Sequence, residues 1–228
     1  MKRLIAVLLC LVASAGACSD DQVVLSRGAL GPARYRVEVQ AEGPVADVTV
    51  SRRATLRVAP RSSGAALTLR LSGEDVKVIN ADIRLSRDGS VTLDRIRGAS
   101  VEGSGQTDLA SLAGQLNPPL PDTPVRLGEV WSSTQRITTR TLQASLRTRL
   151  RIVRFRRISA IDAAEFEGDV TGRLSTTGDS GSFEGRLSGQ TRIVWAVEDG
   201  RVVAAETSLV WSLSTGDRVT LETNLEPA

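Results

Sequence analysis

The run LQASLRTRLRI, residues 142–152, alternates apolar and polar side chains, with arginine at three of its outer positions. Successive side chains of a β-strand point to opposite faces, so a period of two predicts a strand with one buried face and one face in water. Clean alternation of this kind is typical of antiparallel sheets that are solvated on one side.

The same alternation recurs along most of the chain. In the first half it involves Tyr35, Val37, Val39 and Ala41, then Val48 and Val50, Leu56 and Val58, Leu67, Leu69 and Leu71, Ile83 and Leu85, and Val91 and Leu93. In the second half it involves Ala164, Phe166 and Val170, then Phe183, Leu187, Ile193, Trp195 and Val197, then Val203, Ala205, Leu209, Trp211 and Leu213, and finally Val219, Leu221 and Leu225. Asp-Gly pairs at 88–89 and 199–200 stand between alternating runs and predict β-hairpins there.

The segment 108–116 breaks this pattern. Leu109, Leu112 and Leu116 fall at helical spacing, and Asp108 is a suitable N-cap residue. Four prolines between positions 118 and 124 follow, and proline can neither continue a helix nor join a sheet interior. We therefore expect a short helix and a proline-rich connection between two β halves.

These patterns predict a single all-β domain over residues 33–226, with halves at about 33–107 and 125–226 linked by 108–124. About ten or more strands would form a curved antiparallel sheet or half-open barrel. Aromatic residues make up only 3 % of the chain, so the core is expected to be aliphatic.

The chain begins as a secretory signal does. Lys2 and Arg3 precede an apolar run at 4–13, and small residues follow it. The run is shorter than the roughly 20 residues that a transmembrane helix needs, so residues 1–17 are expected to be a cleaved signal peptide. Removing Lys2 and Arg3 lowers the formal net charge from +3 to +1. A nearly neutral domain with few aromatics argues against a nucleic-acid partner.

No constellation in the sequence indicates an enzyme. The string GDSG at 178–181 matches the surroundings of the nucleophile in trypsin-like proteases, but the chain has no histidine to complete a Ser-His-Asp triad. We interpret GDSG as a turn. Missing histidine also removes the commonest metal ligand, and no calcium-binding loop is present. The expectation is no catalytic residue, no metal site and no cofactor.

Two charged runs lie on neighbouring predicted strands. One consists of Arg147, Arg149 and Arg151, and the other of Glu165, Glu167 and Asp169. Cross-strand Arg–carboxylate pairs would explain both runs. The carboxylates as a glycosidase pair, or the arginines as a patch for anionic lipid, are the alternatives.

The string Ala15-Gly16-Ala17-Cys18 resembles the lipobox of bacterial lipoproteins, in which small residues precede a cysteine that is acylated and becomes the mature N-terminus. Leu is commoner than Ala at the first position, and ordinary cleavage after Ala17 is the alternative. The resemblance implies lipidation at Cys18, a tether over 18–32, and the membrane as a partner through the lipid anchor. Ser19 implies, by similarity to Gram-negative sorting, the outer membrane facing the periplasm.

The segment PVRLGEVW, residues 124–131, resembles a P-V-x-[LV]-G-[DE]-x-W element of a family of uncharacterised bacterial envelope lipoproteins. In this element Gly128 and Glu129 would form a tight turn, and Trp131 would enter the core. The general layout is similar, more distantly, to the lipoprotein-carrier superfamily, whose curved sheets hold acyl chains beneath short helices.

These resemblances imply a non-enzymatic envelope lipoprotein that binds an apolar ligand or a partner protein on a concave β face. The candidate ligand-binding residues are Leu109, Leu112 and Leu116, as a movable cover, and Trp131, Trp195 and Trp211 on the inner face. The alternative is a structural or assembly module with a filled core, in which the helix only caps that core.

Overall fold

The computed structural model describes residues 22–28, 30–43, 46–61, 64–73, 76–86, 90–97, 112, 114–115, 117–138, 142–178 and 181–228. Eleven β-strands run through these residues, which confirms the all-β prediction. The strands are β1 Leu30–Gly43, β2 Ala46–Arg61, β3 Gly64–Gly73, β4 Val76–Ser86, β5 Val91–Arg97, β6 Val130–Thr138, β7 Leu142–Ile158, β8 Ile161–Gly178, β9 Gly181–Ala196, β10 Arg201–Leu213 and β11 Arg218–Pro227.

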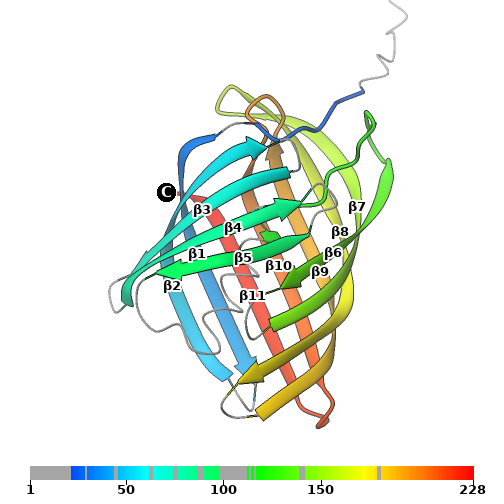
Figure 1. The fold of residues 1–228 in the computed structure, drawn as a ribbon. Helices are drawn as coiled ribbons and strands as arrows, with labels where there is room; N and C mark the ends of the chain where they lie inside the picture. Colours follow the sequence, from blue (N-terminus) through cyan, green and yellow to red (C-terminus); the bar gives the residue numbers. More distant parts are fainter. Residues whose placement is uncertain are drawn as a thin grey trace, which may run out of the picture.

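The strands close into one barrel (Figure 1). β1 completes the ring by pairing antiparallel with β11, from Tyr35 opposite Pro227 to Glu42 opposite Thr220. The prediction of a half-open sheet is therefore wrong, because each strand has a neighbour on both sides. The predicted linking helix is not seen among the described residues.

The odd number of strands requires one pair of neighbouring strands to be parallel. Around a closed ring, strictly antiparallel neighbours require an even number of strands, so a barrel of eleven must contain a parallel pair. That pair is β5 and β6, which meet only at Val91 opposite Ile137 and Thr92 opposite Thr138. The connection between β5 and β6 must therefore return the chain to the end at which β5 began.

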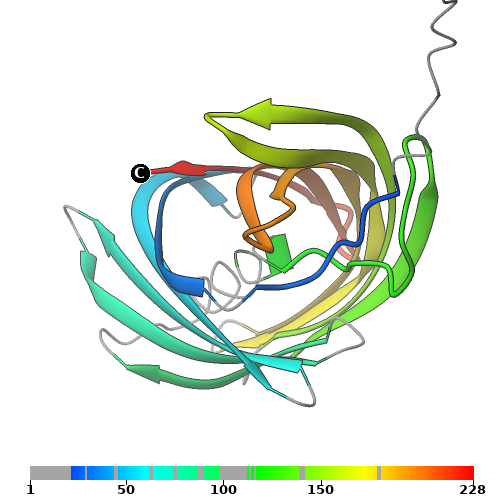
Figure 2. The same cartoon turned by 90° about the horizontal axis from the view of Figure 1, so that it is seen from above.

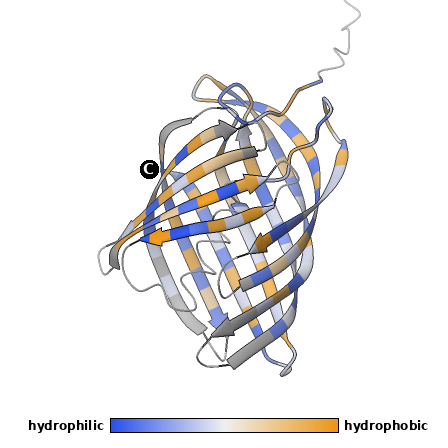
Figure 3. Ribbon diagram, in the orientation of Figure 1, coloured by the Kyte–Doolittle hydropathy of each residue, from blue (hydrophilic) through white to orange (hydrophobic). Residues whose placement is uncertain are grey.

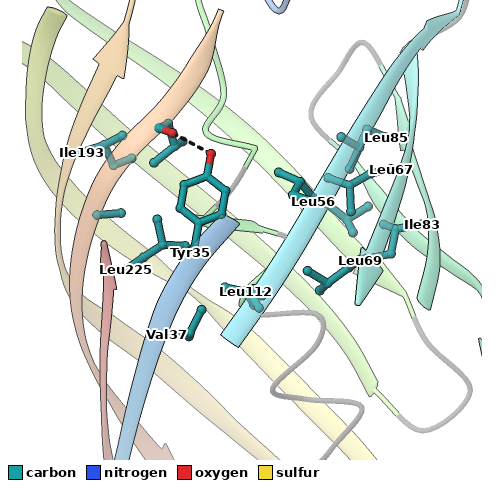
Figure 4. Packing of buried hydrophobic residues seen from close by; sticks show 14 of the residues in the cluster. Tyr35, Val37, Leu56, Leu67, Leu69, Ile83, Leu85, Leu112, Ile193 and Leu225 are labelled. Atoms are coloured by element: carbon teal, nitrogen blue, oxygen red, sulfur yellow. Dashed lines mark hydrogen bonds between the residues drawn. The ribbon is translucent and has the colours of Figure 1, made fainter. Parts of the chain in front are cut away.

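Hydrophobic and hydrophilic residues alternate along many of the strands (Figure 3), and burial alternates with them. On β7, Leu150 and Ile152 are fully buried inside the barrel, whereas the preceding residue of each, Arg149 and Arg151, is exposed. Leu112, from the connection between β5 and β6, belongs to the same core (Figure 4). Figure 4 shows part of this core, including Tyr35, Val37, Leu56, Leu67, Leu69, Ile83, Leu85, Ile193 and Leu225.

Two of the register shifts in the barrel, on β7 and β10, change which residues face inward. The β7–β8 register shifts between Ile152 and Arg154, and the β9–β10 register shifts between Val202 and Ala204. A bulge inserts one unpaired residue, so the residues beyond it exchange faces. Val202 is consequently buried at 1 % exposure, while Val203, which the alternation placed inside, is only half-buried.

Glycines on β8 and β9 explain how the wall curves enough to close. Inward positions of the two strands are occupied by Gly168, Gly172, Gly185 and Gly189. A Cβ atom on Gly168 would overlap the carbonyl oxygen of Arg149, and one on Gly189 would overlap that of Ser208. Adjacent backbones therefore approach as only glycine permits, a device typical of strongly curved sheets and barrel corners.

Two irregular segments, 22–28 and 117–125, cross one mouth of the barrel and are called the cap (Figure 2). Val23 and Val125 form an isolated antiparallel bridge that joins the segments. Gly28 donates its main-chain N–H to the carbonyl oxygen of Gly200 in the β9–β10 turn at 3.1 Å. Residues 22–28, which the sequence assigned to the tether, thus pack on the barrel, with Leu25 only 4 % exposed.

The PVRLGEVW segment leads from the cap into β6. Glu129 donates its N–H to the carbonyl oxygen of Arg126 at 3.0 Å, and Gly128 has a φ of 81°. This is the geometry of a type II turn, which favours glycine at its third position. The predicted turn and the anchoring role of Trp131 are confirmed, since its ring meets Phe166 edge-on with centroids 5.3 Å apart. The described part of the chain contains no helix with the length and hydropathy needed to cross a membrane.

Candidate functional site

The capped mouth contains a pocket of about 440 Å3 between the cap and the wall of β2, β3 and β4. The wall contributes Val58, Ala65 and Leu85, and the cap contributes Leu25 and Leu120. Small-molecule pockets typically measure about 300–1,000 Å3 and have mostly apolar walls. The pocket at the capped mouth has such a volume, and its lining combines these apolar side chains with the polar Ser26, Arg27, Ser86 and Asp122.

Arg27 of the cap lines both this pocket and a smaller void beside it. Its Nε–H donates to Oδ1 of Asn117, and its Nη2 donates to the carbonyl oxygen of Pro118 at 2.9 Å. A guanidinium carries five N–H donors, and none of them meets a described carboxylate. Burial lowers the pKa of Arg27 below its ordinary value, because a buried cation is penalised for leaving water.

Two further hydrogen-bond donors line the smaller void. Asn117 and Trp195 are each only 1 % exposed, and neither Asn117 Nδ2 nor Trp195 Nε1 has a partner in the described structure. The amide orientation of Asn117 follows from Arg27, because only Oδ1 can accept the guanidinium hydrogen bond. The void measures about 10 Å3. This is close to the space that one water-sized group needs.

A second arginine at this void already has a counter-ion. Arg201 donates from Nε to Oδ2 of Asp199 at 2.9 Å. Nearby, the Tyr35 hydroxyl donates to the carbonyl oxygen of Val202 at 2.8 Å (Figure 4). Of the two arginines that line the void, Arg27 is therefore the one without a described anionic partner.

Buried polar groups without partners also occur deeper in the barrel. Gln135 of β6 and Gln115 are 4 % and 8 % exposed, and Gln135 Nε2 and both amide atoms of Gln115 are unpaired in the described structure. The indole N–H of Trp211 is likewise unpaired. Buried polar side-chain atoms usually bond to protein or to ordered water. The interior is therefore suited to enclose water or the polar part of a ligand.

The predicted ligand-binding residues are spread along the barrel. Trp195 is fully buried at the capped mouth, whereas Trp211 lies half-buried against Gly185, well along β10. Trp131 is half-buried and donates its indole N–H to the carbonyl oxygen of Pro119 at 2.9 Å. Leu112 is 3 % exposed. Leu109, Leu116 and Cys18, the predicted lipidation residue, lie outside the described residues.

The two charged runs lie on the paired strands β7 and β8, and the predicted opposition holds for two of their three members. Arg149 is opposite Asp169 and Arg151 is opposite Glu167, whereas Arg147 is opposite Thr171. The structure pairs Glu165 instead with Arg154, which lies beyond the β-bulge.

Glu165 is buried although it points away from the barrel interior. Its side chain is 1 % exposed and lies beneath Arg154, Arg156 and Arg192, with Oε2 at 2.6 Å from Arg154 Nε and 3.2 Å from Arg156 Nε. Burial by itself raises the pKa of this carboxyl, but hydrogen bonds from Arg154 and Arg192 and the charges of Arg192 and Arg156 outweigh it. The pKa of Glu165 therefore lies below its ordinary value.

The GDSG string joins two strands. β8 ends at Gly178 and β9 begins at Gly181, and these two glycines are paired across the ladder. The residues between them lie outside the described structure. In the described part of the chain, no group of three or more Cys, Asp or Glu side chains is placed to hold a metal ion.

Sequence reasoning did not find Arg27 and Asn117. Arg27 lies in the segment interpreted as a tether, and Asn117 precedes the prolines, so neither belongs to an alternating run. The only local signal was the pair of prolines at 118–119, which indicated an irregular segment but not its position in the mouth.

No family model, curated protein or solved structure matches this chain. The resemblances drawn from the lipobox and from PVRLGEVW stay predictions from sequence.

Proposed function

We propose that this protein is a non-enzymatic, lipid-anchored envelope protein that binds an apolar ligand inside its barrel at the capped mouth. The observation that carries the proposal is the pocket of about 440 Å3 between Val58, Ala65 and Leu85 of the wall and Leu25 and Leu120 of the cap. Apolar ligand surface placed there leaves water, which contributes about 25 cal/mol per Å2 of buried area.

The distribution of polarity favours the interior over the outer face for such a ligand. Outward positions of β7 and β8 carry charged side chains, including Arg149, Arg151 and Asp169. Inward positions are mainly aliphatic. An apolar molecule is therefore accommodated within the barrel rather than around it.

The proposed anchor also favours this mouth. Cys18 is four residues before Gln22, the first described residue of the cap. Four extended residues span about 14 Å. Acylation of Cys18 would therefore hold the capped mouth, with its pocket, close to the membrane surface, where lipid molecules are the nearest apolar ligands.

A second candidate function, a structural or assembly module with a filled core, is favoured by the packing farther inside. Leu69, Ile152, Phe166 and Leu225 are fully buried. In this case the pocket would hold only water and the cap would serve to seal the barrel.

Titration with N-phenyl-1-naphthylamine, a neutral apolar dye, separates these functions. We expect saturable fluorescence enhancement that is lost in Ala65→Phe, because Ala65 faces the pocket and is 4 % exposed. Ala66→Phe, on the outward side of the same strand, is the matched control and should bind normally. Absence of dye binding, together with no co-purifying lipid in native mass spectra of detergent-extracted protein, would leave the structural module.

A further inference from the structure

We infer that the apolar ligand carries a single anionic head group, a carboxylate or a phosphate, and that Arg27, Asn117 and Trp195 bind it. This inference rests on the proposed function and specifies its ligand as an anionic amphiphile. The tail would occupy the 440 Å3 pocket, and a head-group oxygen would enter the void beside it.

The guanidinium of Arg27 has no described anionic partner. Its two described hydrogen bonds go to neutral oxygens, those of Asn117 and Pro118. Arg27 is half-buried, and a cation that is partly withdrawn from water is stabilised by pairing with an anion. Asp199 lines the same mouth but already binds Arg201, and Asp122, which lines the pocket, is exposed and forms no described ion pair with Arg27.

The residues around the void have hydrogen-bond donors without described partners. Asn117 offers Nδ2 because Arg27 occupies its Oδ1, and Trp195 can only donate. Together with Arg27, three residues that carry N–H donors therefore line one void. A site lined by donors selects an acceptor, and a charged oxygen forms stronger hydrogen bonds than a neutral one.

The pocket and the void are adjacent. Arg27, Val58 and Leu85 line both the pocket and the void. One molecule can therefore place its apolar part against the wall while its head group reaches the guanidinium. A free anion would gain no contact with the apolar wall, and a neutral lipid would offer the guanidinium no charged acceptor.

Competition against bound N-phenyl-1-naphthylamine tests the inference with dodecanoate, dodecyl phosphate, 1-dodecanol and inorganic phosphate. We expect dodecanoate or dodecyl phosphate to displace the dye from the wild type at concentrations at least tenfold lower than 1-dodecanol. Inorganic phosphate alone should not displace it. The preference between the two anionic amphiphiles distinguishes a carboxylate from a phosphate head group.

Arg27→Met should reduce this preference to less than threefold. Arg36→Met, at an exposed outward position of β1, is the matched control and should keep the preference. Because Arg27→Met can loosen the cap, Asn117→Asp is the second variant. Its new carboxylate would pair with Arg27 inside the protein, so it should raise the Tm and still abolish the preference for anions.

Equal displacement by dodecanoate, dodecyl phosphate and 1-dodecanol in the wild type would overturn the anionic head group and leave the proposed function intact. Retention of the preference in both Arg27→Met and Asn117→Asp would also overturn it. Displacement by inorganic phosphate at the same concentrations as dodecanoate would show that the site binds an anion without an apolar tail, and would overturn the anionic amphiphile as the ligand. Failure of the dye itself to bind would instead contradict the proposed function.

Discussion

Val23 and Val125 exchange both of their main-chain hydrogen bonds, each with an N–O distance of 2.9 Å. This bridge joins the N-terminal segment to the chain that precedes β6, and so holds the two parts of the cap together. Since the pocket at the capped mouth is lined by both segments, the bridge also determines its shape.

Val23→Pro should weaken the cap, because proline has no main-chain N–H to donate to the carbonyl oxygen of Val125. We expect a loss of about 1–3 kcal/mol in the free energy of unfolding, from an unsatisfied carbonyl and a broken bridge. Amide hydrogen exchange at Val125 should also become faster. Val24→Pro is the control, because Val24 is 62 % exposed and lies outside the bridge. Equal exchange at Val125 in both variants would show that the bridge does not hold the cap.

Glu165→Gln should destabilise the protein by about 1–3 kcal/mol, because the buried carboxylate accepts charge-assisted hydrogen bonds from Arg154 and Arg192. Glu167→Gln is the matched control. Its side chain is 48 % exposed and its nearest described contact, to Arg192, is 3.8 Å long. That change should stay within about 0.5 kcal/mol. Urea unfolding at pH 7 compares the two, and similar losses would mean that burial of Glu165 has no energetic consequence.

The stability contributed by Glu165 should depend on pH. Its pKa is lowered in the folded protein, so the contribution is complete above the unfolded pKa of about 4.3 and is lost as the pH falls through the folded pKa. The difference in unfolding free energy between wild type and Glu165→Gln should therefore be constant from about pH 6 upward and shrink below about pH 4. A difference that grows on acidification would contradict the lowered pKa.

Gly189→Ala should strain the wall, because its Cβ atom would overlap the carbonyl oxygen of Ser208 on β10. We expect a loss of about 1–3 kcal/mol, as for overpacked cores. Ser188→Ala, one residue earlier on the outward face, should be nearly neutral. Thermal unfolding followed by circular dichroism measures both. An unchanged Tm for Gly189→Ala would mean that the close strand approach is not needed for closure.

Cys18→Ser should release the protein from the membrane or leave an uncleaved precursor, because acylation of Cys18 is the proposed anchor. Cell fractionation and the mass of the N-terminal peptide test this directly. A variant that is processed normally and stays in the membrane fraction would place the anchor elsewhere.

Local patterns in the sequence were sufficient to predict the strands and most of their faces. The alternation through Leu150 and Ile152 placed those residues inside and the neighbouring arginines outside, because side chains of a strand have a period of two. The turn at Gly128 was also predictable, since a positive φ selects glycine. Where a bulge intervenes, as at Val203, the period fails by one residue because the bulge inserts one unpaired residue into the strand.

By itself, the sequence determined that the chain is all-β, that its core is aliphatic and that its outer face is polar, because these properties follow from composition and from a repeat of two residues. Only the tertiary structure decided that the sheet closes, since closure pairs β1 with β11 at opposite ends of the chain. Only the tertiary structure brought Arg27 to Asn117, ninety positions apart. Contacts of this range depend on strand number, curvature and the return of the chain across the mouth, and none of these is encoded in a local period.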